Sequence, residues 1–153
     1  FIGGHPRDVG VYVDYAHTSD AIDNVLQSLR PHTHGRLICI FGCGGDRDRD
    51  KRPKMGGIAV KLADSVIITN DNPRQEDPQQ ILDDIISGLP QTKQPVHIEL
   101  DRKLAIEKAI SLANPHDIIL IAGKGHEDYQ ILKSGTIHFD DRQIARQALE
   151  KHH

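Results

Sequence analysis

Short runs of apolar residues alternate along this chain with segments whose apolar residues recur at the spacing of a helix. The runs are rich in Val and Ile and are bounded by polar or glycine-containing segments, a pattern typical of buried strands. We predict strands at residues 11–13, 37–41, 65–69, 96–99 and 117–122. We predict helices at residues 21–29, 53–63, 78–87, 102–112 and 141–149. A hairpin is predicted to join residues 129–132 and 136–139.

This order of elements predicts an α/β fold. Strands that alternate with helices are joined by right-handed crossovers, which produces a mostly parallel sheet with helices on both faces. We therefore predict a three-layer domain with a β-hairpin near its C-terminus. Open parallel sheets bind ligands beyond the carboxyl ends of their strands. The loops to search for a site are therefore residues 14–18, 42–52, 70–74 and 123–127.

Composition narrows the classes of function. The chain has 153 residues, 37% of them hydrophobic and 27% charged, which suits one globular domain. The net charge of −3 indicates neither nucleic acid nor an anionic membrane as a partner. The apolar run at residues 118–122 is too short to span a bilayer. Cys39 and Cys43 are the whole thiol inventory, and reduced thiols fit a cytoplasmic protein. No other ligands stand near them, so we predict no metal site.

The loop at residues 14–18 carries Asp14, His17 and Thr18 just before a predicted helix. A carboxylate at this place can accept hydrogen bonds from a ribose, as acidic residues do in nucleotide-binding folds. The alternative is that Asp14 and Thr18 only organise the turn and cap the helix. This loop alone favours the alternative.

Glycines dominate the next loop, which reads GCGG and continues into a run of alternating charges. Glycines let a backbone approach a ligand closely and can aim several N–H groups at an anion. The loop matches neither G-x-x-x-x-G-K-[ST] nor G-x-G-x-x-G. Arg47 stands beside the glycine turn and is a ligand candidate, whereas Arg49 and Asp50 are predicted to be solvated.

The loop at residues 70–74 reads NDNPR. Pro73 restricts its own backbone and biases Asn72 toward an extended conformation, which stiffens the loop. Arg74 presents a planar guanidinium that can bind a carboxylate through two hydrogen bonds. An ordinary turn with an exposed arginine explains the spacing equally well.

The loop at residues 123–127 reads GKGHE and follows the most hydrophobic strand. Lys124, His126 and Glu127 could form an acid–base cluster, or Glu127 could pair with the ammonium of a ligand. A flexible loop is the alternative. Four loops rich in charge and glycine at one edge of a sheet favour a common site over four unrelated turns.

Together these loops resemble the Mur ligase family. The strings DYAHT, GCGGDRD with KRP after it, DNPR and AGKGHEDYQ occur in the order found in that family, and the match covers about residues 11–149. The resemblance implies a Rossmann-like C-terminal domain at residues 11–150 that binds the incoming amino acid. It also implies that residues 1–10 are a linker from a central ATPase domain, with residues 151–153 as a tail.

The reaction that the resemblance implies is acyl activation. ATP phosphorylates the terminal carboxylate of a UDP-linked muramoyl dipeptide, and the amino group of the incoming residue attacks the acyl phosphate. ATP and Mg²⁺ would be bound mainly by the central domain, because G-x-x-G-K-[ST] does not occur in this chain. This domain alone is therefore expected to be inactive.

The resemblance also implies which amino acid is added. DNPR resembles the pattern of members that use meso-diaminopimelate, whereas lysine-adding members carry a different residue at Arg74. The residues implied to bind meso-diaminopimelate are Arg47, Asp71, Asn72, Pro73, Arg74, Gly123 and Glu127. Asp14 and His17 are implied to lie near the nucleotide and the central domain. Ser19 departs from the family, which has proline there, and this is expected to remove no ligand.

Two alternatives remain open at this stage. One is a binding module of this fold without activity, and the other is a member that adds a different amino acid, such as L-lysine. A nucleotide enzyme of another class is disfavoured by the incomplete glycine fingerprint.

Overall fold

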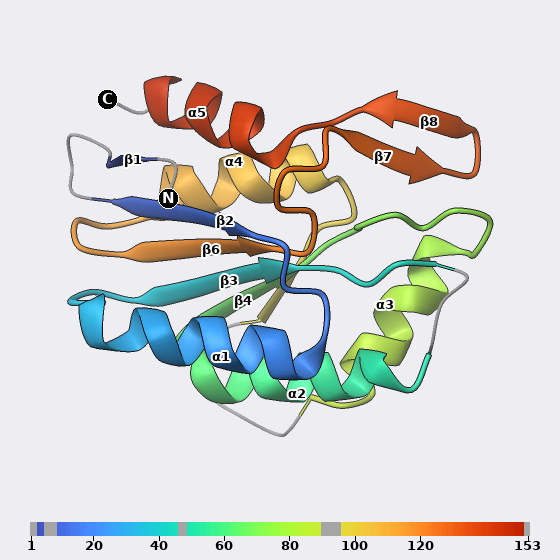
Figure 1. Cartoon of the computed structure of the whole chain (residues 1–153), viewed down its shortest axis with the longest axis horizontal. Helices are drawn as coiled ribbons and strands as arrows, with labels where there is room; N and C mark the ends of the chain where they lie inside the picture. The colour runs from blue at the N-terminus through green and yellow to red at the C-terminus, as the bar shows by residue number, and fades with distance from the viewer. Residues whose placement is uncertain (1–2, 5–8, 46–48, 90–95, 152–153) are drawn as a thin grey trace.

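The fold is built on one sheet, seen in a computed structural model that describes residues 3–4, 9–45, 49–89 and 96–151. Among these residues the strand order is β1-β2-β6-β3-β4-β5. The parallel strands are β2 (Gly10–Asp14), β3 (Leu37–Phe41), β4 (Ser65–Ile68), β5 (Val96–Ile98) and β6 (Ile118–Ala122). Because these strands run the same way, their carboxyl ends meet at one edge of the sheet (Figure 1).

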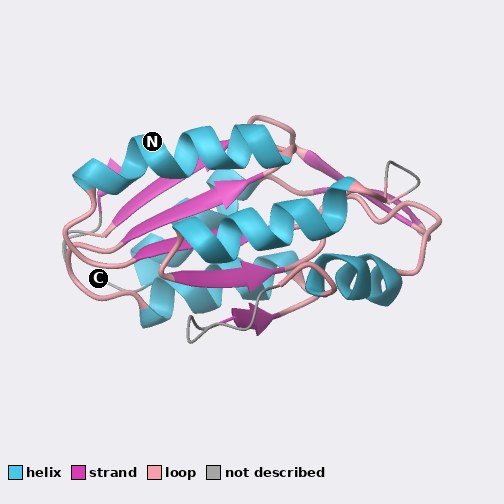
Figure 2. Cartoon of the chain, turned by 90° about the horizontal axis from the view of Figure 1, so that it is seen from below, coloured by secondary structure: helices cyan, strands magenta, loops and turns pink. Residues whose placement is uncertain are grey.

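Helices cover both faces of the sheet (Figures 1 and 2). On one face lie α1 (Ser19–Leu29), a short 3₁₀ turn (Arg30–His32) and α2 (Lys51–Leu62), with α3 (Pro78–Ile86) packed beside α2. On the other face lie α4 (Arg102–Leu112) and α5 (Asp141–Lys151).

Two apolar clusters fill the spaces between the layers. Successive side chains of a strand point to opposite faces, so Cys39 packs toward α1 and α2 while Ile38 and Ile40 pack toward α4 and α5. All five residues of β3 and of β6 are buried. Burial on both faces explains why these strands appear in the sequence as unbroken apolar runs.

Polar side chains fix where the helices begin. Thr18 Oγ1 accepts a hydrogen bond from the Ala21 amide (3.1 Å), so α1 starts at Ser19. Asp101 caps α4 in the same way, as predicted, by accepting from the Leu104 amide (3.2 Å). Helix α2 begins at Lys51, two residues before its predicted start, and Pro53 is tolerated because first-turn amides need no intrahelical partner.

The predicted α/β architecture is confirmed, including the C-terminal hairpin of β7 (Tyr129–Leu132) and β8 (Gly135–His138). Strand β1 (Gly3–Gly4), which pairs antiparallel with β2, was not predicted. It lies within the segment interpreted as a linker, and two glycines carry no alternating pattern. No helix in the described parts of the chain is long and apolar enough to cross a membrane.

Candidate functional site

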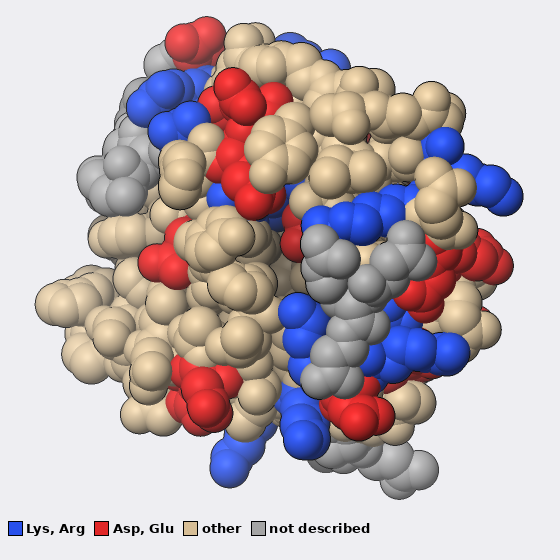
Figure 3. All heavy atoms as spheres, turned by 45° about the vertical axis from the view of Figure 1, so that its right-hand side comes forward, with Lys and Arg blue, Asp and Glu red and all other residues tan. Residues whose placement is uncertain are grey.

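A cavity of about 410 Å³ opens at the carboxyl edge of the sheet. Four loops and the start of α2 line it, through Tyr15, His17, Thr18, Gly44, Lys51, Asp71, Asn72, Arg74, Gly123 and Glu127. Basic and acidic side chains intermix on the side of the molecule that Figure 3 turns forward. The structure thus gathers loops that are far apart in the sequence around one polar cavity.

Six residues predicted for the site line this cavity: His17, Asp71, Asn72, Arg74, Gly123 and Glu127. Pro73 lies in the same loop but is not among the lining residues. Arg47 lies outside the described residues. The prediction missed Lys51, whose Nζ donates to the carbonyl of His17 (3.2 Å). Its place in a run of alternating charges gave no sign that it faces a cavity.

The loop after β4 is tied to the glycine loop after β3. The Gly45 amide donates to the Asn72 carbonyl (2.7 Å), and Arg74 Nη1 donates to the Gly45 carbonyl (3.0 Å). A Cβ atom on Gly45 would lie 1.8 Å from the Pro73 carbonyl oxygen, so only glycine fits there. The two loops therefore form one rigid wall of the cavity.

Lys124 lies behind the cavity and is fully buried. Its Nζ donates to Asn72 Oδ1 (2.8 Å) and to the Tyr129 carbonyl (3.0 Å), and forms an ion pair with Asp71 Oδ1 (3.1 Å). Burial lowers the pKa of Lys124, and the neighbouring Asp71 carboxylate partly offsets that effect.

Glu127 supplies a second carboxylate to the cavity. Its Oε2 accepts a hydrogen bond from the Tyr129 hydroxyl (3.3 Å), and its Oε1 lies 3.9 Å from Lys124 Nζ. The negative charge of Glu127 raises the pKa of the Tyr129 phenol. Asp71 and Glu127 make one part of the cavity acidic, while Arg74 and Lys51 contribute positive charge. Such a cavity suits a ligand that carries both an ammonium and a carboxylate.

A buried arginine supports the cavity from the side of α2 and α3. Arg52 is fully buried, and its guanidinium contacts Glu76 (2.6 and 2.8 Å), Asp84 (2.8 Å) and the Gly44 carbonyl (3.1 Å). Hydrogen bonding, chiefly from Arg49, lowers the pKa of Asp84 to about 2. Arg49 was predicted to be solvated; it is exposed, but it forms an ion pair with Asp84 (2.9 Å).

A second buried arginine joins the ends of two central strands. Arg102 forms a fully buried ion pair with Asp141, through two contacts of 2.7 Å. The same guanidinium donates to the carbonyl of Asn70 (2.9 Å), the first residue of the loop at residues 70–74, and to that of Ala122 (3.2 Å), the last residue of β6. The charge of Asp141 raises the pKa of Arg102 despite its burial.

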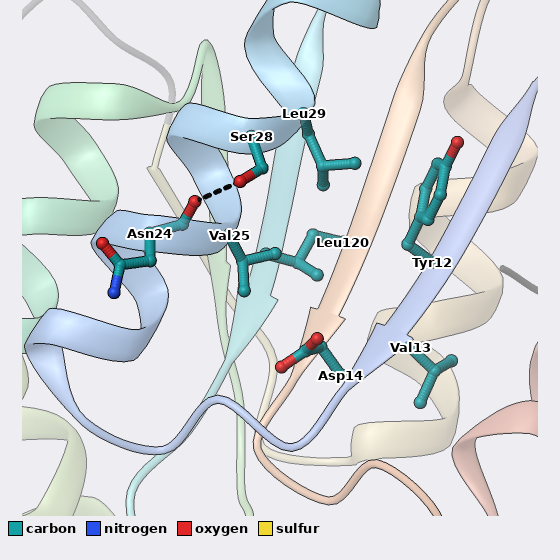
Figure 4. Close-up of a pocket in the computed structure, with 8 residues that line it drawn as sticks. All are labelled: Tyr12, Val13, Asp14, Asn24, Val25, Ser28, Leu29 and Leu120. Carbon is teal, nitrogen blue, oxygen red and sulfur yellow. Dashed lines mark hydrogen bonds between the residues drawn. The ribbon is translucent and has the colours of Figure 1, made fainter.

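Asp14 and His17 are not brought together in one cavity. Asp14 Oδ1 accepts from the Ala16 amide (2.9 Å), which organises the turn, and Asp14 lines a separate cavity of about 330 Å³ between β2 and α1 (Figure 4). His17 is exposed, its Nδ1 lies 2.8 Å from the Tyr15 carbonyl oxygen, and its ring lies 4.6 Å from that of Tyr15.

A larger cavity of about 580 Å³ lies between α4, α5 and the hairpin. Its lining is mostly apolar and contains none of the residues predicted for the site. Arg102 lines it, but its charge is already paired with Asp141. The smaller, polar cavity is therefore the candidate functional site.

Known proteins resemble this chain over most of its length. A family model described as "Mur ligase, glutamate ligase domain" matches residues 1–125. The UDP-N-acetylmuramoyl-L-alanyl-D-glutamate–2,6-diaminopimelate ligase of Trichormus variabilis is 61% identical over 143 residues, which is 94% of this chain. The ligase of the same name from Synechococcus elongatus is 61% identical over 146 residues, or 95% of this chain. This chain spans 29% of the length of each of these relatives.

Solved structures of ligases share the fold of this chain. A structure of a ligase with this name superimposes with a TM-score of 0.92 at 45% identity, over 95% of this chain and 30% of that one. A domain from a ligase of Haemophilus ducreyi shares the fold, with a TM-score of 0.65 at 20% identity over 99% of this chain and 96% of that one. The chain therefore belongs to the Mur ligase family.

Proposed function

We propose that this chain is the amino-acid-binding domain of an ATP-dependent ligase that adds meso-diaminopimelate to UDP-N-acetylmuramoyl-L-alanyl-D-glutamate. The observation that carries the proposal is the presence of Arg74 and Glu127 in one cavity of about 410 Å³. The names of relatives 61% identical to this chain favour the same reaction.

The charges of the cavity fit a diamino dicarboxylic acid. The guanidinium of Arg74 can bind one carboxylate with two hydrogen bonds, and Arg47 is proposed to bind meso-diaminopimelate as well. Glu127 and the Gly123 carbonyl can accept hydrogen bonds from an ammonium. Asp71 adds negative charge there, while Asn72 and Pro73 hold Arg74 in place. Lysine lacks the distal carboxylate, and a site built around a polar group rejects an analogue without it by roughly 10⁴-fold.

In the proposed reaction this chain presents the incoming amine. The amine attacks the acyl phosphate of the dipeptide carboxylate, an amide bond forms, and phosphate leaves. The described residues include no group of three or more His, Cys, Asp or Glu side chains that could hold a metal ion. Because the sequence has no G-x-x-G-K-[ST] motif, we assign ATP and Mg²⁺ mainly to other parts of the ligase.

Asp14 and His17 are proposed to face those other parts and the nucleotide. His17 is exposed beside the cavity, and Asp14 is partly exposed at the end of β2. We place the reaction in the cytoplasm, because Cys39 and Cys43 are both free thiols in the structure.

The test uses the full-length ligase with ATP, Mg²⁺, the UDP-linked dipeptide and either meso-diaminopimelate or L-lysine. We expect ADP release that depends on meso-diaminopimelate, together with a product heavier by one diaminopimelyl residue. A kcat/KM for lysine equal to or above that for meso-diaminopimelate would identify a lysine-adding ligase instead. Binding of either amino acid without any ADP release would identify a binding module.

A further inference from the structure

We propose that Lys124 is a positioning residue, which joins the loop after β4 to the loop after β6 so that Asp71, Arg74 and Glu127 are held in the geometry that binds the incoming amino acid. This inference rests on the proposed function for the identity of the ligand. It concerns a residue that does not touch the ligand itself.

Three oxygen atoms surround the ammonium of Lys124. Its Nζ donates hydrogen bonds to Asn72 Oδ1 (2.8 Å) and to the Tyr129 carbonyl (3.0 Å), and it forms an ion pair with Asp71 Oδ1 at 3.1 Å. An ammonium has donors and no acceptor, so oxygen atoms are the partners that suit it. Glu127 Oε1 lies 3.9 Å away, beyond hydrogen-bonding distance, and is left to accept from a ligand.

The partners of Lys124 extend the connection to Arg74. Asn72 Oδ1 also accepts from the Ile131 amide (2.9 Å), and the Arg74 amide donates to the Ile131 carbonyl (3.0 Å). Gln130 Nε2 donates to the Asp71 carbonyl (2.8 Å). Strand β7 thus lies alongside the loop after β4 and is hydrogen-bonded to it. Lys124 is the charged group at the centre of these contacts.

Lys124 is buried behind the cavity, whereas residues next to it in the loop line the cavity. Its side chain is 0% exposed, whereas Gly123 and Glu127 on either side of it line the cavity. Gly123 and Gly125 have positive φ angles of 118° and 57°, which lets the chain turn the lysine inward and the flanking residues outward. Lys124 therefore acts on the ligand through other side chains.

Charge gives a second reason for a lysine at this position. Asp71 and Glu127 are two carboxylates on one cavity, and like charges repel strongly where water is scarce. Lys124 lies between them, at 3.1 and 3.9 Å. Without its charge, Asp71 and the Asn72 side chain would each lose a buried partner and would be expected to reorient.

The main test is the substitution Lys124→Met in the full-length ligase. Methionine is an unbranched side chain of similar length to lysine, but it carries no charge. We expect KM for meso-diaminopimelate to rise at least tenfold, while KM for ATP and for the UDP-linked dipeptide stays within twofold of wild type. Lys61→Met, at an exposed position on α2, is the matched control and should leave all three KM values unchanged. Leu26→Ala, in the core beneath α1, controls for lost stability and should leave the amino-acid KM unchanged.

An unchanged KM for meso-diaminopimelate, or an equal rise in all three KM values, would overturn the proposal. A fall in kcat with unchanged KM would overturn it as well, because it would place Lys124 in the chemistry. If Lys124→Met does not fold, Lys124→Gln gives the same comparison, since it also removes the charge but keeps a polar group at the buried position. Failure of both variants to fold would make Lys124 a folding residue and would also reject the proposal.

Amide exchange in this chain tests the inference without any substrate. The Ile131 amide is held by Asn72 Oδ1, so its exchange should accelerate in Lys124→Met, while that of Leu120 in β6 should not change. Should the wild-type ligase reject meso-diaminopimelate, the proposed function fails and this measurement still decides the role of Lys124. Equal exchange at Ile131 in variant and wild type would reject that role.

Discussion

Arg74 has a left-handed backbone conformation, with φ of 55°, which is uncommon for a residue with a long side chain. Its amide donates to Ile131 and its guanidinium donates to the carbonyls of Gly45 (3.0 Å) and Asn72 (3.3 Å). These contacts over-determine the conformation, and such strained residues cluster at ligand-binding sites. The strain and the position in the cavity together support Arg74 as the residue that reads a carboxylate.

Replacing Arg74 should change which amino acid is used. Removing one partner of a buried charge pair costs about 2–5 kcal/mol, so Arg74→Ala should lower kcat/KM for meso-diaminopimelate by roughly 30-fold or more. Arg74→Lys should restore only part of the loss, because an ammonium cannot make the two-pronged contact. The measurement is kcat/KM for meso-diaminopimelate and lysine with each variant. If Arg74→Ala leaves the ratio of the two values unchanged, Arg74 is not the selector, and Arg47 becomes the next candidate.

At the scale of elements, two buried arginines connect helices to the loops of the site. Arg102 joins α4 and α5 to the first residue of one loop and to the residue before another, and Arg52 joins α2 and α3 to the glycine loop. Both side chains are fully buried, and most of their partners are carboxylates or backbone carbonyls. Buried side chains of the helices thus hold the loops of the cavity in place.

The Arg102–Asp141 pair gives a stability prediction. Arg102→Met leaves the Asp141 carboxylate buried without its partner, which should lower the free energy of unfolding by about 3–5 kcal/mol. The double variant Arg102→Met/Asp141→Leu should recover much of this loss, because it leaves no buried charge. Urea denaturation of the four proteins in this cycle measures the coupling. A loss below about 1 kcal/mol in Arg102→Met would show that the pair does not secure α4 and α5.

Asp84, which joins α3 to Arg49 and Arg52, gives a prediction about pH. Its folded-state pKa of about 2 lies below the ordinary value of 3.8, so the ionised carboxylate stabilises the fold above that ordinary value. This contribution is lost as the pH falls through the folded-state pKa. Asp84→Asn should therefore be less stable than wild type at neutral pH, and the difference should shrink toward pH 2. Urea midpoints across this range measure it; Asp83→Asn, at an exposed position on α3, is the control and should show no such convergence.

At the scale of the whole molecule, the sequence was enough to predict the five parallel strands of the sheet and the loops that line the cavity. Buried parallel strands such as β3 and β6 are unbroken apolar runs, and the positions of their carboxyl ends follow from the fold class. That is why His17, Asp71, Arg74 and Glu127 could be assigned to one edge before their contacts were known.

The connections behind the cavity could not be predicted in this way. Arg52, Arg102 and Lys124 are charged residues in a chain with 27% charged residues, and nothing in the neighbouring sequence shows that they are buried. Their burial depends on partners such as Glu76, Asp141 and Asn72, which lie 24, 39 and 52 positions away. Long-range pairing of this kind is visible only when the loops are placed in space.

The last prediction concerns the activity of this chain by itself. The cavity is proposed to bind the amino acid, but no phosphate-binding G-x-x-G-K-[ST] motif occurs in these 153 residues. Incubation of the chain with ATP, Mg²⁺, the UDP-linked dipeptide and meso-diaminopimelate should therefore release no ADP above background. Cooperative unfolding by urea in the same preparation would show that the chain is folded, which its two helix-covered apolar clusters lead us to expect. The full-length ligase is the positive control. Robust turnover by the chain alone would mean that these residues bind and activate ATP themselves. The proposal that other parts of the ligase bind ATP would then be wrong.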